Sequence, residues 1–127
     1  MRKANDPLVA IVDDDDETTG ILAEFLERRE LRTRTFDSAE GIRDCRPQQF
    51  DAIILDINLP GMWGTECSYR LRRNGYEGPI IAITGNLEGW DEDDLYDLGF
   101  TCVLGKPFDP KELAACVKEH ISAAGMT

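Results

Sequence analysis

Segments typical of β-strands alternate five times with segments typical of helices along this chain of 127 residues. Short apolar runs between polar residues are typical of buried strands, and apolar residues at helical spacing indicate a helix with one packed face. The expected strands are Leu8–Asp13, Arg32–Phe36, Ala52–Asp56, Pro79–Thr84 and Thr101–Gly105. This alternation predicts right-handed βαβ units, and therefore one α/β domain built on a parallel sheet.

Residues that start and stop helices bound the segments between the strands. The expected helices are Glu17–Arg29, a segment from an Asp37 cap to about Pro47, a segment that ends at Arg73, Leu87–Leu98, and a segment from an Asp109 cap to about Ala123. Asp37 and Glu40 have the spacing of a capping box. Asp109 and Pro110 are a strong helix start, because aspartate caps well and proline suits the first helical position.

The charge balance argues against nucleic-acid and membrane partners. Lys and Arg total 14 against 25 Asp and Glu, which gives a net charge of −11 at pH 7 and repels phosphate. No apolar stretch approaches the roughly 20 residues of a membrane span, and residues 1–7 lack the apolar core of a signal peptide. We therefore expect a cytoplasmic protein without direct nucleic-acid binding or membrane insertion. The acidic stretch Glu88–Asp97 is expected to be a solvated helix face, with docking of a basic partner as the alternative.

The cysteines and the single histidine give no metal or redox motif in the sequence. The cysteines are Cys45, Cys67, Cys102 and Cys116. Because they are far apart in the sequence and no secretory signal is visible, we expect reduced, buried thiols. His120 lies late in the last expected helix, where a helix-end role is favoured over a role as ligand or base.

Acidic residues directly follow two of the apolar runs. Asp13–Asp16 follows the first run and Asp56 ends the third. The carboxyl ends of parallel strands form the rim where open α/β sheets place their sites. If these two strands are neighbours, Asp13, Asp14 and Asp56 converge, and converging carboxylates take up protons or a cation. The sequence therefore predicts a Mg²⁺ site at this rim.

Four motifs at the ends of expected strands resemble the receiver domain of two-component response regulators. They are Val12-Asp13-Asp14-Asp15, the segment from Leu55 to Met62, Ile83-Thr84-Gly85 and Lys106-Pro107-Phe108. The resemblance implies a flavodoxin-like, doubly wound (βα)5 fold with a five-stranded parallel sheet of order 2-1-3-4-5. It also implies an N-terminal extension at residues 1–7, a receiver (response regulatory) domain at residues 8–124, and no effector domain in the chain.

By this resemblance, Asp56 is the phosphoacceptor and Mg²⁺ is the cofactor, with Mn²⁺ able to replace it. A carboxylate at a strand end is chemically suited to attack phosphorus and form an acyl phosphate. The implied metal site comprises Asp14 and Asp56 as direct ligands, the backbone carbonyl of Asn58, and Asp13 holding a metal-bound water or supporting the site from behind. We interpret Asp15 and Asp16 as acidic residues at the start of a helix, where their negative charge interacts favourably with the helix dipole.

Lys106 and Thr84 complete the catalytic residues that the resemblance implies, together with Asp56. Lys106 is expected to contact the Asp56 carboxylate before reaction and a phosphoryl oxygen afterwards. A compact ammonium group with three hydrogen-bond donors suits both contacts. The Thr84 hydroxyl is expected to bond the phosphoryl group and to pull the following loop with it. The proline after Lys106 is often cis in this family.

The chain departs from the usual receiver pattern at three positions. Val103 replaces an aromatic residue that changes rotamer with the threonine, so the conformational signal is expected to leave through the loop after the fourth strand. Gly85 gives that loop more backbone freedom. Trp63 replaces a small polar residue and is either a partner contact or a cover for its loop. Asn58 and Asn86 flank the site, and we predict measurable self-dephosphorylation.

The function implied is that of a phosphoprotein in phosphorelay signal transduction. A sensor histidine kinase or histidine phosphotransfer protein would supply the phosphoryl group, and a downstream protein would read it. We expect a monomer or weak homodimer that is not an enzyme beyond catalysing its own phosphorylation and slow autodephosphorylation.

Three other classes of protein share parts of this pattern. One is a degenerate receiver that acts as a phosphorylation-independent interaction module. A haloacid-dehalogenase-like phosphatase needs a second acid where this chain has Asn58. An FMN-binding flavodoxin needs a phosphate loop where four aspartates would repel phosphate.

Overall fold

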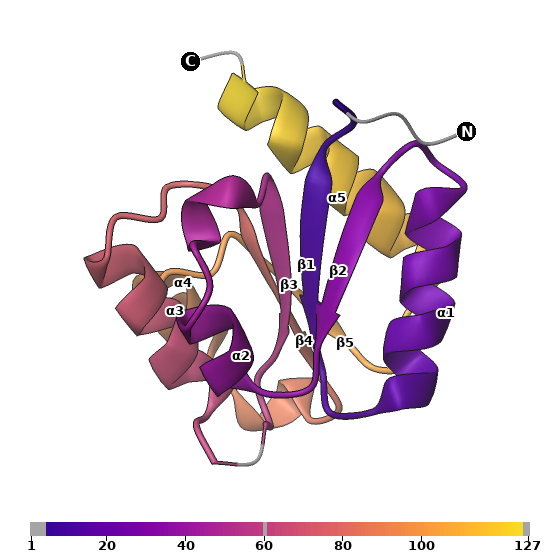
Figure 1. Ribbon diagram of the computed structural model, residues 1–127. Coiled ribbons are helices and arrows are strands. Elements are labelled where there is room, and N and C mark those ends of the chain that lie inside the picture. Colours follow the sequence, from indigo (N-terminus) through magenta and orange to yellow (C-terminus); the bar gives the residue numbers. More distant parts are fainter. Residues whose placement is uncertain (1–4, 60, 126–127) are drawn as a thin grey trace.

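A five-stranded parallel sheet forms the centre of the computed structural model, which describes residues 5–59 and 61–125 (Figure 1). The strands are β1 (Leu8–Val12), β2 (Arg32–Phe36), β3 (Ala52–Asp56), β4 (Ile80–Thr84) and β5 (Cys102–Gly105). Their order is β2-β1-β3-β4-β5, which confirms the implied topology. Because the winding reverses between β1 and β3, the carboxyl ends of these two strands flank the crevice where such sheets bind ligands.

Helices cover both faces of the sheet (Figure 1). They are α1 (Asp16–Glu27), α2 (Ala39–Arg43), α3 (Gly64–Arg73), α4 (Glu92–Asp97) and α5 (Pro110–Gly125). α1 and α5 enclose one apolar cluster with the sheet, and α2, α3 and α4 enclose the other. The helices on each face present apolar side chains at helical spacing, as Leu22 and Leu26 do on α1.

The middle strands are buried on both faces. In β3, Ile53 and Leu55 belong to the cluster under α2, α3 and α4, whereas Ile54 belongs to the cluster under α1 and α5. All three side chains are fully buried, and each contributes about 2 kcal/mol of hydrophobic free energy. Burial on both faces is the pattern expected from an uninterrupted apolar run, and it fixes the position at which β3 ends in Asp56.

Two helix predictions were wrong. The N-cap of α2 is Ser38, whose Oγ accepts from the backbone N–H of Gly41 at 3.3 Å, and not Asp37. α2 ends at Arg43 instead of near Pro47, and Pro47–Gln49 forms a separate 3-10 turn.

The segment predicted as one helix from Leu87 to Leu98 is also divided. It contains a 3-10 turn at Leu87–Gly89, an extended residue at Trp90, and the short helix α4. Asp91 starts α4 because its side chain accepts from the N–H of Asp93. The other predicted boundaries lie within two residues of the observed ones.

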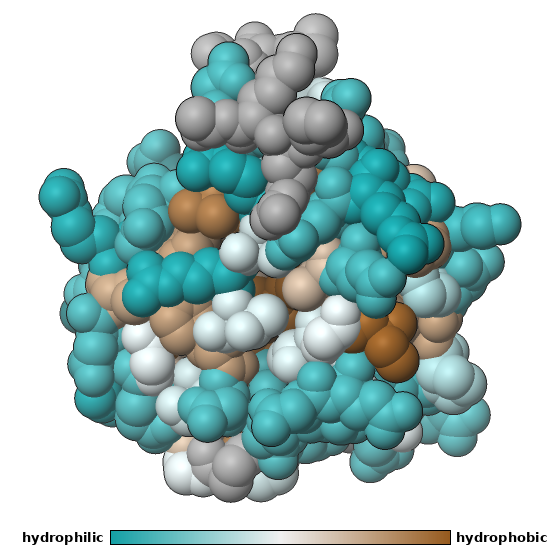
Figure 2. Space-filling model, turned by 45° about the vertical axis from the view of Figure 1, so that its right-hand side comes forward, coloured by the Kyte–Doolittle hydropathy of each residue, from teal (hydrophilic) through white to brown (hydrophobic). Residues whose placement is uncertain are grey.

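Hydrophilic side chains form most of the surface seen in Figure 2, and hydrophobic residues show between them in small areas. Among residues 5–59 and 61–125, no helix combines the length and the apolar character that crossing a bilayer requires. All four cysteines are free, but only Cys67 is fully buried; Cys45, Cys102 and Cys116 are partly exposed, so the expectation of buried thiols was wrong for these three.

Candidate functional site

The paired strands β1 and β3 bring three carboxylates together. Val12 pairs with Leu55 in the parallel register, so the next residues, Asp13 and Asp56, lie side by side at the carboxyl ends of the strands. Oxygen atoms of Asp13, Asp14 and Asp56 all lie within 4.8 Å of one another. Asp13 and Asp56 are buried, with exposed fractions of 1% and 5%, whereas Asp14 faces solvent. The sequence therefore predicted this cluster correctly.

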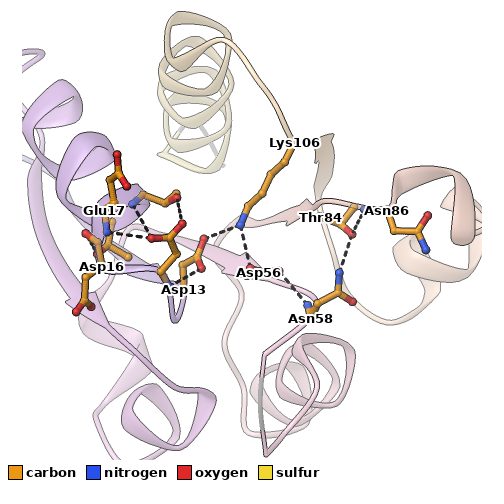
Figure 3. Close-up of polar contacts among 11 residues, drawn as sticks. Asp13, Asp16, Glu17, Asp56, Asn58, Thr84, Asn86 and Lys106 are labelled. Carbon is orange, nitrogen blue, oxygen red and sulfur yellow. Dashed lines mark hydrogen bonds and ion pairs between the residues drawn. The ribbon is translucent and has the colours of Figure 1, made fainter.

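Lys106 places an ammonium group between two of these carboxylates. Its Nζ donates to Asp13 Oδ2 at 2.9 Å and to Asp56 Oδ2 at 3.1 Å, as Figure 3 shows. The backbone N–H of Lys106 donates to the Thr84 carbonyl at 2.7 Å, which fixes the start of the side chain at the end of the sheet. The peptide bond between Lys106 and Pro107 is cis.

The site keeps an excess of negative charge. Three carboxylates face one ammonium group, and hard oxygen ligands with uncompensated charge are the donors that Mg²⁺ prefers. Burial raises the pKa of Asp56, and the neighbouring Asp13 adds to this effect, while hydrogen bonds from Asn58 and Lys106 oppose it. The donor set therefore fits a divalent cation, which would offset the repulsion among these carboxylates.

The ammonium group of Lys106 is held in its charged form. Burial lowers its pKa, but the hydrogen bonds to Asp13 and Asp56 outweigh this cost, so the pKa lies above its ordinary value. Lys106 therefore supplies one fixed positive charge to the site at neutral pH.

Thr84 and Asn58 form a second row of contacts behind Asp56 (Figure 3). The backbone N–H of Asn58 donates to Asp56 Oδ1 at 2.9 Å, and its amide Nδ2 donates to Thr84 Oγ1 at 3.3 Å. Thr84 Oγ1 also accepts from the backbone N–H of Asn86 at 3.1 Å. The Thr84 hydroxyl, which is fully buried, is thus held by the two asparagines that flank the site.

Asp15 and Asp16 start α1, as predicted. Asp15 is the N-cap, and its carboxylate accepts from the backbone N–H groups of Glu17 and Thr18 and from the Thr18 hydroxyl. These hydrogen bonds, chiefly that from the Thr18 hydroxyl, lower the pKa of Asp15. Asp13 Oδ1 accepts from the N–H of Asp15 at 3.0 Å, so the cap also orients Asp13.

Gly64 shapes the site in a way that our sequence analysis missed. A Cβ at Gly64 would lie 2.3 Å from the Asp56 carbonyl oxygen and 2.7 Å from Ile57 Cα. The Gly64 N–H donates to the Ile57 carbonyl at 2.8 Å, so the start of α3 lies directly against the backbone of the site. The signal available in the sequence was a glycine at the first position of an arginine-rich helix. The neighbouring Trp63 is 54% exposed.

Comparison with known families identifies the class of protein. The sequence model of the response regulator receiver domain matches residues 9–118, and the chain belongs to this family of two-component signalling proteins. It is 32% identical over 111 residues to the alkaline phosphatase synthesis transcriptional regulatory protein PhoP of Bacillus subtilis, covering 87% of this chain and 46% of the relative. It is 30% identical over 125 residues to the transcription factor SKN7 of Chaetomium thermophilum, covering 96% and 16%.

The chain spans about half or less of the length of the curated relatives it matches. Because relatives named as transcription factors and transcriptional regulators are among them, the absence of nucleic-acid binding stays a prediction.

Solved structures agree with the assigned fold. A CheY-like receiver domain protein of Methanospirillum hungatei aligns with a TM-score of 0.82 and 26% identity, over 92% of this chain and 94% of that one. The receiver domain of the sensor histidine kinase PA1611 of Pseudomonas aeruginosa, solved with magnesium in its active site cleft, aligns with a TM-score of 0.81 and 26% identity, over 92% and 98%.

Proposed function

We propose that the chain is the phosphoacceptor receiver of a phosphorelay, and that Asp56 takes a phosphoryl group from a sensor histidine kinase or a histidine phosphotransfer protein. The single observation that carries this proposal is the Asp56 carboxylate, which ends β3 beside Asp13 and Asp14 and accepts a hydrogen bond from Lys106. Membership of the receiver family supports the reaction class.

In the transfer step, a carboxylate oxygen of Asp56 attacks the phosphorus of the donor. A bond forms between that oxygen and phosphorus, the bond from phosphorus to the donor breaks, and the donor keeps the electron pair. Asp56 Oδ1 already accepts from the Asn58 N–H, which orients the carboxylate. Lys106, bonded to Oδ2, is placed to contact a phosphoryl oxygen and to offset its charge.

Asp13, Asp14, Asp56 and the backbone carbonyl of Asn58 would hold Mg²⁺, or Mn²⁺ in its place. The three carboxylates supply the charge and the oxygen donors that such a site requires, and the magnesium in the cleft of the PA1611 receiver supports this assignment. When bound, the cation supplies positive charge that lets an anionic donor approach the aspartates.

After transfer, the Thr84 hydroxyl would bond a phosphoryl oxygen. It must then exchange its contacts with Asn58 Nδ2 and the Asn86 N–H, so the loop after β4 would move with it. Val103 is a partly buried β5 residue without an aromatic ring to reorient, which supports a signal that leaves through the β4 loop. The two asparagines flank the acyl phosphate, where they would influence attack by water and allow slow self-dephosphorylation.

The wider assignments follow from the same proposal. Residues 8–124 form the receiver, which is a cytoplasmic monomer or weak homodimer and catalyses only its own phosphorylation and dephosphorylation. Its partners are a phosphodonor and a downstream protein, with no direct nucleic-acid contact.

Intact mass spectrometry tests the proposal, with Mg²⁺ and acetyl phosphate as a small phosphodonor. The full chain should gain about 80 Da, the mass of one phosphoryl group. Asp56→Asn should lose this adduct, whereas the control Asp97→Asn, which changes an exposed carboxylate on α4, should keep it. A folded wild-type chain that gains no mass would contradict the proposal and favour the phosphorylation-independent module.

A further inference from the structure

Two cysteines that are distant in the sequence meet at the edge of the sheet. Cys102 lies on β5, an edge strand, and Cys116 lies on α5. Both cysteines pack against the apolar cluster that α1 and α5 enclose with the sheet. The Sγ atom of Cys116 is 2.9 Å from the Sγ atom of Cys102. A disulfide bond is about 2.05 Å long, so the sulfur atoms are within about 1 Å of bonding distance.

The arrangement distinguishes the roles of the two sulfurs. The Cys116 thiol donates its hydrogen to the Cys102 sulfur. Burial and this hydrogen bond raise the pKa of Cys116 to about 12, and the carboxylates of Glu119 and Glu112 add to the effect. Cys116 therefore stays a thiol at neutral pH, and its S–H is directed at the Cys102 sulfur. Cys102 is the sulfur suited to react first, because the thiolate is the nucleophile in thiol chemistry.

His120 stands beside the second sulfur. Its Nδ1 lies 2.8 Å from the Cys116 carbonyl oxygen and 3.5 Å from Cys116 Sγ. A carbonyl oxygen only accepts, so Nδ1 carries a hydrogen and donates it. The same N–H is therefore in place to stabilise a thiolate on Cys116 when one forms.

Cys102 and Cys116 are both partly exposed, whereas Cys67 is buried. Cys67 is expected to be inert because its buried sulfur is closed to a dissolved oxidant, and burial and nearby carboxylates also raise its pKa to about 12. Cys45 and Cys67 thus provide internal controls for any reaction at the other pair.

We propose that Cys102 and Cys116 form a thiol-pair modification site, at which a small disulfide such as glutathione disulfide oxidises them to an intramolecular disulfide. The Cys102 thiolate attacks one sulfur of the oxidant, the oxidant's S–S bond breaks, and one glutathione thiolate leaves and takes the proton that Cys102 released. The Cys116 sulfur gives up its proton and attacks the Cys102 sulfur, and the second glutathione leaves with that proton. The protein loses two electrons and two protons, and glutathione disulfide gains them.

The product would tie α5 to β5 covalently. The bond would close a loop that contains Lys106, the turn after it and the first turns of α5. Because α5 packs on the face opposite α3 and α4, the bond would hold α5 against β5 on that face and would not involve Asp56. The inference is therefore independent of phosphorylation at that residue.

Differential alkylation of the folded full chain tests the site. The reduced protein is incubated in a glutathione and glutathione disulfide buffer, quenched with acid, unfolded and treated with N-ethylmaleimide. In a sample taken before alkylation, the intact mass should be about 2 Da below that of the reduced chain. After alkylation, two of the four cysteines should remain unmodified. Peptide mapping of the wild-type chain should link Cys102 to Cys116, and this measurement needs no variant.

Matched variants separate this pair from the others. Cys102→Ser and Cys116→Ser should each abolish the cross-link, whereas Cys45→Ser and Cys67→Ser should leave it unchanged. The same oxidation in concentrated urea should give mixed pairings, so the folded chain should enrich the Cys102–Cys116 link at least tenfold. Full alkylation of both cysteines after oxidation, a stable glutathione adduct on one of them, or a link that involves Cys45 or Cys67 would each overturn the proposal.

Discussion

Substitution of Gly64 by alanine should disturb the site without touching any carboxylate. The new Cβ would lie 2.3 Å from the Asp56 carbonyl oxygen, 2.7 Å from Ile57 Cα and 3.0 Å from the Asp56 carbonyl carbon. All three atoms are backbone atoms at the end of a buried strand, so no side chain can rotate to make room. The start of α3 must therefore move away from β3 by about 1 Å, which is the scale at which core overpacking becomes costly.

The expected cost is about 2–4 kcal/mol in the free energy of unfolding. Overpacking accounts for about 1–3 kcal/mol, and loss or weakening of the 2.8 Å hydrogen bond from the Gly64 N–H to the Ile57 carbonyl adds about 1 kcal/mol. Because Asp56 is part of the displaced backbone, phosphorylation by acetyl phosphate should also slow.

The matched control is Gly20→Ala in the middle of α1. A Cβ at Gly20 would meet no atom within 4 Å, so the substitution should stabilise the chain by about 0.5–1 kcal/mol through helix propensity. Urea unfolding followed by circular dichroism measures both variants. The packing argument is refuted if Gly64→Ala is as stable as the wild type, or if the two alanines shift stability in the same direction.

Two further predictions concern Tyr76 and Lys106. Tyr76→Phe removes a buried hydroxyl that donates to the Phe50 carbonyl at 3.1 Å, so urea unfolding should show a loss of about 1–2 kcal/mol, against almost none for the exposed Tyr69→Phe. Burial raises the pKa of Tyr76. The protonated hydroxyl therefore contributes to the free energy of unfolding below pH about 10, and this contribution is lost as the pH rises further. The phenylalanine variant should accordingly lose less stability than the wild type in an alkaline titration. Lys106→Ala should slow phosphorylation by roughly 100- to 1,000-fold in a mass-spectrometric time course. Lys111→Ala, at an exposed residue of α5, should leave the rate unchanged, and equal rates for both variants would contradict the role of Lys106.

The sequence predicted the carboxylate cluster once the family resemblance supplied the strand order. The long apolar runs specify β1 and β3 as buried strands, and the implied order 2-1-3-4-5, which the structure confirms, makes these strands neighbours. Residues directly after the two runs, Asp13 and Asp56, must then lie together. The convergence of Lys106 from the end of β5 followed from the family resemblance, since nothing in its local sequence indicates the direction of its side chain.

Local sequence patterns could not predict which of two adjacent capping residues starts a helix, or which residues of different elements meet in the fold. Asp37 and Ser38 are adjacent, and both are good capping residues, so sequence alone does not decide which one begins α2. The contact of Gly64 with the backbone of β3 and the meeting of Cys102 with Cys116 arise from packing of helices on the sheet. No spacing rule within one element gives either contact.

Chemical location of the phosphoryl group tests the central claim most directly. Borohydride reduces an acyl phosphate to an alcohol, so the phosphorylated chain, treated with borohydride and mapped by peptide mass spectrometry, carries homoserine at the phosphorylated aspartate. The account predicts homoserine at Asp56 in the sample treated with Mg²⁺ and acetyl phosphate, and none in a sample without the phosphodonor. Homoserine at Asp13 or Asp14 in place of Asp56, or at no aspartate, would contradict it.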